Sequence, residues 1–242
     1  MMTAETHPEV QGELRENEPM SRHTSWRVGG SADLFFMPAS VEDLSQFLRE
    51  LAIDTPIFWH GVGSNLLVRD GGIRGVVISA SKILKDLERV ESVRTIDRAG
   101  DIHHRAPGEY SIAYRSVTGP SDEWFIEATF RFDPEAVASK ETLDAMLERR
   151  KTTQPLGLPS CGSVFRNPPG DHAARLIQEA ELKGHRIGGA EVSAKHANFI
   201  INADNATATD VEELIEHVRH AVIERHGVEL VHEVRIVGEV LQ

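Results

Sequence analysis

Between two prolines the chain reads Pro159-Ser160-Cys161-Gly162-Ser163-Val164-Phe165-Arg166-Asn167-Pro168. No other stretch decides as much about the fold and the chemistry of this protein. It holds a hydroxyl, a guanidinium and a carboxamide within five residues, at Ser163, Arg166 and Asn167. Gly162 precedes the hydroxyl, so a ligand can approach the backbone closely there. The arrangement is typical of a loop that presents an acid to one end of an anionic substrate.

Ser163 does not lie in a hydrolase elbow, because the chain contains no Gly-x-Ser-x-Gly. A serine without a neighbouring base is a poor nucleophile. It can instead donate a proton to a strongly basic carbanion. The alternative is a serine that only shapes a turn or caps a helix.

Composition limits the possible partners. The 242 residues are enough for one large domain or two small ones, and the net charge of -12 argues against nucleic acid or an anionic membrane as a partner. The single cysteine, Cys161, excludes an intrachain disulfide and suits a reducing compartment. No apolar run reaches the length of a membrane span, and the N-terminus lacks a secretion signal. We therefore expect a cytoplasmic protein.

The spacing of apolar residues predicts an α+β fold. Ser40 and Asp43 form a capping box before one helix, Ser139 can cap a second, and Thr209 with Glu212 predicts the start of a third that ends at Gly227. Residues 1–20 are polar and mostly acidic, which predicts a disordered tail. Strands are predicted at 28–37, 57–59, 73–78, 90–96, 124–132, 198–202 and 228–237. The boundary between two units is expected near residue 133.

A second stretch, Gly61-Val62-Gly63-Ser64-Asn65, follows a short apolar strand. Its glycines allow a ligand to come close, and successive N–H groups can form an anion-binding nest. It is not the dinucleotide fingerprint, because the third glycine is missing and the residues after it read strand, Gly-Gly turn, strand. A hairpin turn is the alternative interpretation.

Two further residues carry charge in unusual surroundings. Arg115 lies between Tyr114 and Ser116, and an arginine there could fork onto a carboxylate; the alternative is a surface cation. Glu233 lies inside an apolar strand; the alternative is an exposed strand face. The histidines show no metal-ligand spacing, so no metal site is expected.

Together these segments resemble the UDP-N-acetylenolpyruvoylglucosamine reductases, flavoproteins of bacterial peptidoglycan synthesis. The likeness runs in the family's order from about Ser21 to the C-terminus. It is carried by Thr24-Ser25-Trp26-Arg27-Val28-Gly29-Gly30, the glycine stretch through Leu67, Tyr114-Arg115-Ser116, Arg149-Arg150, Gln154-Pro155, Pro159 to Pro168, His196-Ala197-Asn198-Phe199 and Glu233-Val234-Arg235. The form of the proline-flanked stretch resembles the subtype without an extra tyrosine-bearing substrate loop.

The resemblance implies an FAD-binding domain of the vanillyl-alcohol-oxidase (PCMH) type over residues 21–133 and a smaller α/β substrate domain over 134–242. It implies that NADPH reduces FAD, and that the flavin passes hydride to the enolpyruvyl ether of a UDP-sugar. The partner implied is thus a small molecule, and we expect a monomer.

The same resemblance implies roles for single residues. Ser163 matches the proton donor, and Arg115 with Glu233 matches the pair that polarises the substrate carboxylate. Hydride addition places negative charge on that carboxylate, so a cation and an acid beside it lower the barrier. The other residues implied are Tyr114, Arg150 and Asn167 for the substrate, and Gly61, Gly63, Ser64, Asn65 and Leu66 for the cofactor.

The chain departs from the family between Ile78 and Val90. The family has several tens more residues there, including a second glycine-rich flavin loop, Ile-Pro-Gly-x-x-Gly-Gly-Ala, followed by Met-Asn-Ala-Gly. Neither motif occurs here. Two other hypotheses therefore stand beside the reductase: an impaired or inactive relative that only binds a nucleotide sugar, and a flavin oxidase of the same broad fold.

Overall fold

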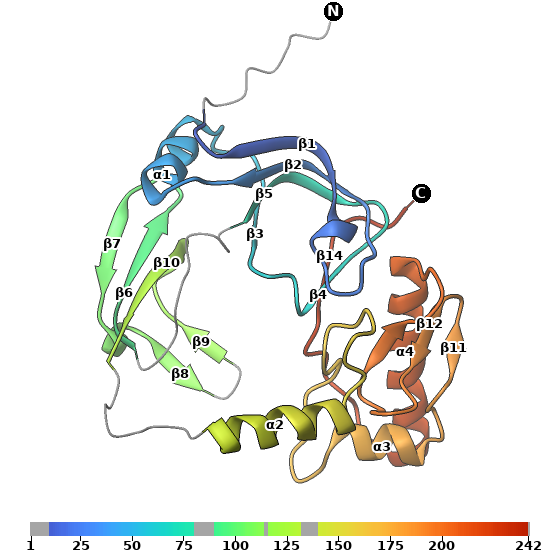
Figure 1. Ribbon diagram of the computed structural model, residues 1–242. Coiled ribbons are helices and arrows are strands. Elements are labelled where there is room, and N and C mark those ends of the chain that lie inside the picture. Colours follow the sequence, from blue (N-terminus) through green and yellow to red (C-terminus); the bar gives the residue numbers. More distant parts are fainter. Residues whose placement is uncertain (1–9, 80–89, 114–115, 132–139, 242) are drawn as a thin grey trace, which may run out of the picture. The chain divides into compact units, whose positions relative to one another are not determined.

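The computed structural model describes residues 10–79, 90–113, 116–131 and 140–241 (Figure 1). The chain divides into two compact units, each assembled from separate segments. The first comprises Met1–Glu16, Leu34–Gly61 and Gly75–Val137, and the second comprises Asn17–Asp33, Val62–Arg74 and Ala138–Gln242. The boundary expected near residue 133 lies close to the last division. The grouping of residues 17–33 and 62–74 with the C-terminal segment was not predicted.

The largest sheet has four strands, in the order β1-β2-β5-β3. Its strands are β1 (Glu13–Pro19), β2 (Ser31–Met37), β5 (Ile73–Ser79) and β3 (Ile57–His60). Strands β3 and β5 are parallel, with Ile57 opposite Val76. Strands β1, β2 and β5 each have residues in both units.

The second sheet of the first unit is antiparallel and runs in the order β10-β6-β7. Its strands are β6 (Val90–Asp97), β7 (Ile102–Arg105) and β10 (Glu123–Phe130). The alternation predicted for β10 is confirmed at its centre, where Ile126 is fully buried and Phe125 is 47% exposed. A short pair, β8 (Ser111–Ala113) with β9 (Ser116–Thr118), and the 3-10 turn Pro107–Glu109 lie between β7 and β10 in the chain.

Helix α1 (Val41–Glu50) begins where its capping residues predict. The Ser40 hydroxyl accepts the N–H of Asp43 at 3.2 Å. The buried Asp43 carboxylate in turn accepts backbone N–H groups of Gln11, Gly12 and Ala39 at 2.8 to 2.9 Å. The apolar face of the helix packs on both sheets in one core: Phe36, Leu44, Phe47, Leu48, Val76, Ile78, Ile96 and Ile126.

The predicted disorder of residues 1–20 is wrong for their second half. Residues 13–19 form β1, and Met20 in the following 3-10 turn (Met20–Arg22) is fully buried. Acidic composition misled the prediction, because β1 lies at the edge of its sheet and an edge strand tolerates charged, exposed residues. Residues 1–9 lie outside the described part of the chain.

The second unit contains three helices and five short strands among its described residues. The helices are α2 (Lys140–Thr153), α3 (Ala173–Glu179) and α4 (Ala208–His226). The strands β11 (Arg186–Ile187), β12 (Ala190–Val192) and β13 (Ile200–Asn202) form an antiparallel sheet in that order. The strands β4 (Leu66–Val68) and β14 (Arg235–Val237) form a parallel pair.

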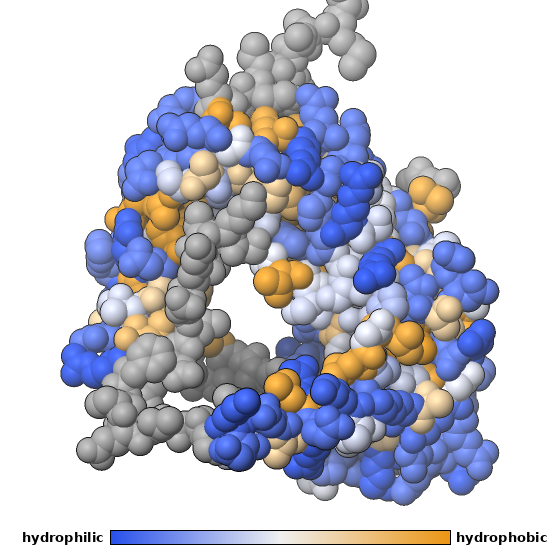
Figure 2. All heavy atoms as spheres, viewed as in Figure 1, coloured by the Kyte–Doolittle hydropathy of each residue, from blue (hydrophilic) through white to orange (hydrophobic). Residues whose placement is uncertain are grey.

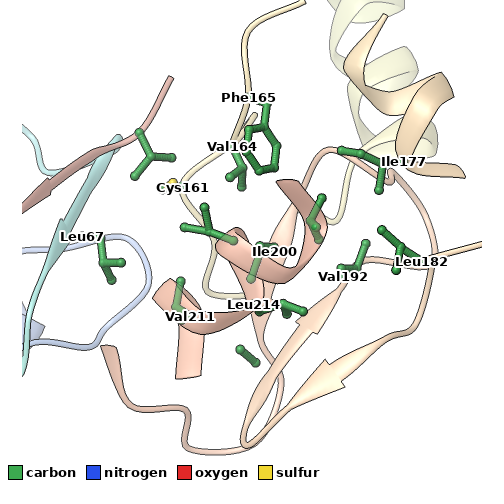
Figure 3. Close-up of a cluster of buried hydrophobic side chains, with 14 of the residues drawn as sticks. Leu67, Cys161, Val164, Phe165, Ile177, Leu182, Val192, Ile200, Val211 and Leu214 are labelled. Carbon is green, nitrogen blue, oxygen red and sulfur yellow. The ribbon is translucent and has the colours of Figure 1, made fainter. Parts of the chain in front are cut away.

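Helix α4 packs its apolar stripe into the core of this unit. Val211 and Leu214 lie in one cluster with Val192, Ile200 and Phe165 (Figure 3). Gly227 ends the helix in the left-handed conformation at φ 65°, as predicted. By contrast, Met146 and Leu147 of α2 are 61% and 53% exposed, and Figure 2 shows apolar atoms at the surface near α2.

The start of α4 differs from the prediction by two residues. Thr207, not Thr209, is the capping residue: its hydroxyl accepts the N–H of Asp210 at 3.0 Å, and the Asp210 carboxylate accepts the N–H of Thr207 at 2.9 Å. Thr209 instead binds Asp70, a residue from a distant segment. Two threonines two positions apart offer two registers, and the Thr-x-x-Asp spacing from Thr207 selects the observed one.

One predicted strand is corrected. Only residues 235–237 of the stretch 228–237 form a regular strand. Strands β4 and β5 follow each other across a turn, as predicted, and they join different sheets. Close backbone approach fixes this turn: a Cβ added at Gly30 would lie 2.2 Å from the Asp70 carbonyl oxygen.

Candidate active site

The proline-flanked stretch forms an irregular strand with a neighbour on each side. On one side, the Asn202 N–H donates to Pro159 O and the Val164 N–H donates to Asn198 O, both at 2.9 Å. On the other side, the Arg166 N–H donates to Val231 O at 2.9 Å. The chain leaves this ladder between Ser160 and Val164, where Gly162 adopts the left-handed region at φ 81°. Ser163 therefore lies on a bulge, which was not predicted from the sequence.

Glu233 contacts this bulge by a hydrogen bond between backbone groups. Its N–H donates to the carbonyl oxygen of Val164 at 2.8 Å, and Val164 directly follows Ser163. The side chains of Ser163 and Glu233 are both half-buried. Residues 70 positions apart in the sequence, both predicted to be catalytic, thus come from adjacent backbone segments.

Asn65, the last residue of the glycine stretch, is hydrogen-bonded to the segment that contains Glu233. Its side-chain Nδ2 donates to the Glu233 carbonyl oxygen at 2.8 Å, and its backbone oxygen accepts the N–H of Arg235 at 3.2 Å. These bonds extend the parallel pairing of β4 with β14, in which Leu66 lies opposite Arg235. The Asn65 side chain is therefore bound to protein backbone.

The glycine stretch itself has the features of an anion nest. Val62 is 77% exposed, and Gly63 adopts φ 64° while its carbonyl oxygen accepts the N–H of Ser25 at 3.1 Å. Within the described part of the chain, no backbone N–H from Gly61 to Ser64 donates a hydrogen bond. Free, successive N–H groups of this kind suit a phosphate group, such as one end of FAD. Leu66 is 6% exposed, so only its backbone is available to a ligand.

Cys161 lies at the start of the bulge and points into the core (Figure 3). Its thiol contacts Asn65 Oδ1 at 4.0 Å. Burial, and after it the negative charge of Glu233, raise the pKa of this thiol far above its ordinary value. The negative charge of Glu233 thus disfavours the ionised form of this thiol.

Asn198 is a site residue whose role the sequence did not reveal. The side chain is 4% exposed and makes two hydrogen bonds to Phe165: Oδ1 accepts its N–H at 3.0 Å, and Nδ2 donates to its carbonyl oxygen at 2.8 Å. The signal that could have found it is a carboxamide between apolar residues in His196-Ala197-Asn198-Phe199. The neighbouring His196 accepts the Asn198 N–H at Nδ1, and burial together with Lys183 lowers its pKa.

The remaining predicted residues are distributed differently. Asn167 is exposed, and its Oδ1 accepts the N–H of Ala173 at 3.1 Å at the start of α3. Arg150 is exposed on α2 and donates to Gln154 at 3.4 Å. Arg115 and Tyr114 lie outside the described residues, so their predicted roles stay predictions.

Among the described residues, no group of three or more His, Cys, Asp or Glu side chains is arranged to hold a metal ion. None of the helices among them is long and apolar enough to cross a membrane.

Comparison with known proteins shows the family of this chain. Residues 154–237 match the family model of the UDP-N-acetylenolpyruvoylglucosamine reductase C-terminal domain, which includes the bulge and Glu233. The chain is 45% identical to the UDP-N-acetylenolpyruvoylglucosamine reductase of Alkalilimnicola ehrlichii, over 99% of both chains. It is 42% identical to that of Methylococcus capsulatus, over 98% of this chain and 97% of the relative.

The fold matches a solved relative as well. The crystal structure of UDP-N-acetylenolpyruvylglucosamine reductase from Thermus caldophilus superimposes with a TM-score of 0.73 at 25% identity, covering 94% of this chain and 99% of that chain. Sequence identity of 42% and 45% to the two curated relatives, over nearly the whole length, indicates common descent. The chain belongs to the UDP-N-acetylenolpyruvoylglucosamine reductase family.

Proposed function

We propose that this protein reduces UDP-N-acetylglucosamine enolpyruvate to UDP-N-acetylmuramate in peptidoglycan precursor synthesis, with NADPH as the reductant and FAD as the cofactor. The observation that carries the proposal is the backbone contact of Glu233 with Val164, next to Ser163, in a chain that belongs to the reductase family. We place the reaction in the cytoplasm and assign it to a monomer.

FAD, when bound, supplies the hydride that adds to the enolpyruvyl double bond. In this proposal residues 21–133 form the FAD-binding domain of the vanillyl-alcohol-oxidase type, and residues 134–242 form the substrate domain. The free N–H groups of residues 61–64 would hold one phosphate of the cofactor. Asn65 serves through its backbone, because its side chain is bound to Glu233.

The chain's own residues complete the reduction. Arg115 and Glu233 polarise the substrate carboxylate, so that the charge developing there is stabilised. Ser163 delivers the proton to the carbon that does not receive the hydride, so the double bond gains one hydride and one proton. Asn167, Arg150 and Tyr114 orient the nucleotide sugar. NADPH leaves as NADP⁺.

We also infer that this chain lacks a segment that its relatives have between Ile78 and Val90. The second glycine-rich flavin motif is absent from the sequence. The alignment with the Alkalilimnicola ehrlichii relative spans 296 positions, although this chain has 242 residues. The proline-flanked stretch supports the subtype without the tyrosine-bearing loop.

The absent motif favours a second candidate function, a relative that binds the nucleotide sugar without flavin chemistry. FAD binding energy is spread along a long ligand, and the glycine stretch provides for only one part of it. We therefore expect weak FAD binding by this chain and a destabilised first unit.

A flavin titration with thermal melts separates the two candidates. The reductase requires a yellow protein that consumes NADPH only when the enolpyruvyl sugar nucleotide is present. Colourless protein whose melting temperature rises with the nucleotide sugar but not with FAD supports the binding relative. NADPH consumption that needs oxygen and ignores the sugar nucleotide indicates a flavin oxidase.

A further inference from the structure

We propose that Asn198 is the positioning residue for Ser163, because its carboxamide replaces a missing strand neighbour and closes the bulge that carries the serine. The part of this inference that concerns proton transfer rests on the proposed function. The part that concerns the bulge does not, and it can be tested without cofactor or substrate.

The bulge is anchored at both ends on the β13 side. At its first end, Ser160 forms an isolated antiparallel bridge with Ile201, and the Asn202 N–H donates to Pro159 O. At its second end, the Val164 N–H donates to the Asn198 carbonyl oxygen. Between these anchors three residues, Cys161, Gly162 and Ser163, lie opposite only two, Phe199 and Ile200, and the extra residue makes the bulge.

A side chain continues the pairing beyond the second anchor. Beyond Val164 the next residue, Phe165, exchanges both of its backbone hydrogen bonds with the Asn198 carboxamide, at 3.0 and 2.8 Å. Oδ1 takes the place of a strand carbonyl and Nδ2 takes the place of a strand N–H. A buried pair of backbone groups would otherwise stay unsatisfied, which is costly in the interior.

The same anchor also holds Glu233. The Val164 carbonyl oxygen accepts the Glu233 N–H on the opposite side. Val164 is therefore held from both sides, by Asn198 and by Glu233, one residue after Ser163. Loss of the Asn198 carboxamide should loosen the serine relative to the carboxylate.

Cys161 provides the reporter. It is the only cysteine of the chain, it lies in the bulge, and it is 6% exposed. We would measure the rate at which a small pyridyl disulfide labels it, relative to the denatured chain at the same pH. For Asn198→Ala we expect labelling at least about tenfold faster than in the parent, at denaturant concentrations far below global unfolding, because local opening exposes the thiol.

The matched control is Asn202→Ala. Asn202 also makes two side-chain bonds to backbone, donating to Trp26 O and accepting the Ala206 N–H. Its loss should lower global stability and leave labelling at low denaturant unchanged. Equal acceleration in both variants, or labelling that follows global unfolding in Asn198→Ala, would overturn the proposal.

Asn198→Asp adds a test by pH, which also serves if Asn198→Ala does not fold. A protonated carboxyl can accept from the Phe165 N–H and donate to the Phe165 carbonyl oxygen, but a carboxylate cannot donate. Burial raises the pKa of such a carboxyl, so protection should be near the parental level in acid and fall as pH rises. Labelling of Asn198→Asp that parallels the parent at every pH would show that the donor is not needed.

Activity provides the last arm. With FAD and NADPH, Asn198→Asp above the carboxyl's pKa should lower kcat for the sugar nucleotide about tenfold or more, with flavin reduction and KM near the parental values. Faster labelling without a fall in kcat would overturn the proposal that Asn198 positions Ser163 for proton transfer. It would leave standing only the proposal that Asn198 holds the bulge closed. Absence of turnover in the parent counts against the proposed function only, since the labelling arms still decide the bulge.

Discussion

Ser163 suits a proton donor of high pKa, because the carbanion left by hydride addition is a strong base. We predict that Ser163→Ala slows reduction of the sugar nucleotide by at least about a hundredfold, the usual scale for a lost acid catalyst. Flavin reduction by NADPH should stay unchanged. Stopped-flow measurement of the two half-reactions tests this, with Ser160→Ala from the same stretch as the control. Equal rates for Ser163→Ala and the parent would remove the serine from the mechanism.

Glu233 is expected to act on charge that develops during the reaction. Glu233→Gln and Arg115→Lys should both lower kcat more than they raise KM, because each partner matters most in the transition state. Steady-state kinetics measures the split. Glu229→Gln, which changes a 73% exposed side chain paired with Arg219, is the matched control. A raised KM with unchanged kcat would indicate ground-state binding instead.

Cys161 predicts a dependence of stability on alkaline pH. Burial first, and Glu233 second, raise the pKa of its thiol in the folded state, whereas in the unfolded chain it ionises near its ordinary value of about 8.5. Above that pH the unfolded state releases a proton that the folded state keeps. The free energy of unfolding should then fall by about 1.4 kcal/mol per pH unit, up to the folded pKa.

Comparison with Cys161→Ala isolates this contribution. Denaturant titrations of both proteins should give a constant difference in unfolding free energy at neutral and acidic pH. Above about pH 8.5 the parent should lose stability faster than the variant. Parallel pH profiles through the alkaline range would mean that the folded thiol ionises as readily as the unfolded one.

At the scale of elements, the start of α4 depends on a residue from outside the helix. The Asp70 carboxylate accepts the N–H groups of Ala208 and Thr209 and the Thr209 hydroxyl, at 2.8 to 3.1 Å. A negative charge at this end also favours the helix dipole. We predict that Asp70→Ala lowers the free energy of unfolding by about 1–2 kcal/mol, the range for a lost helix cap. The exposed Asp204→Ala should change it little, and chemical denaturation of the two variants compares them.

Sequence patterns were sufficient where an element is determined by its own residues. The Ser40 cap of α1, the Gly227 end of α4 and the burial of Ile126 in β10 follow from local spacing, and all three are confirmed. The reciprocal half of the predicted capping box is wrong, because the Asp43 carboxylate accepts N–H groups of Gln11, Gly12 and Ala39 and not that of Ser40. The Asp70 cap and the pairing of β4 with β14 join segments more than a hundred residues apart. No local pattern encodes such a meeting.

The site shows the same division. A glycine that lets a ligand approach beside Ser163 and a carboxylate at Glu233 were predicted, since a residue type and a known family pattern indicated them, but the bulge itself was not. The Asn198 clamp and the use of the Asn65 side chain on Glu233 were not. Each depends on which backbone groups lack a strand neighbour in the folded chain, and that is visible only in three dimensions.

At the scale of the whole molecule, the interleaved units predict that a fragment of residues 134–242 cannot fold alone. The core of the second unit includes Trp26, Val28 and Leu67, which are at most 4% exposed and absent from such a fragment. Loss of large core side chains costs about 2–5 kcal/mol each, which together rivals the 5–15 kcal/mol that stabilises a typical domain.

Circular dichroism and one-dimensional NMR of the fragment test this expectation. We expect little cooperative thermal unfolding and poor chemical-shift dispersion. A fragment joined by a linker to residues 17–33 and 62–74 should recover part of both. A cooperative melt for residues 134–242 alone would show that the N-terminal segments decorate this core and do not complete it.

The hydrogen bond of Trp26 also constrains folding during synthesis. Its indole N–H bonds to the carbonyl oxygen of Ile200, 174 residues later in the chain. A ribosome adds about 5–20 residues per second, so the delay between synthesis of the tryptophan and synthesis of its partner is roughly 9–35 seconds. During this interval an apolar surface of the nascent chain has no native partner. The nascent protein is therefore prone to aggregate through this surface until Ile200 has been synthesised.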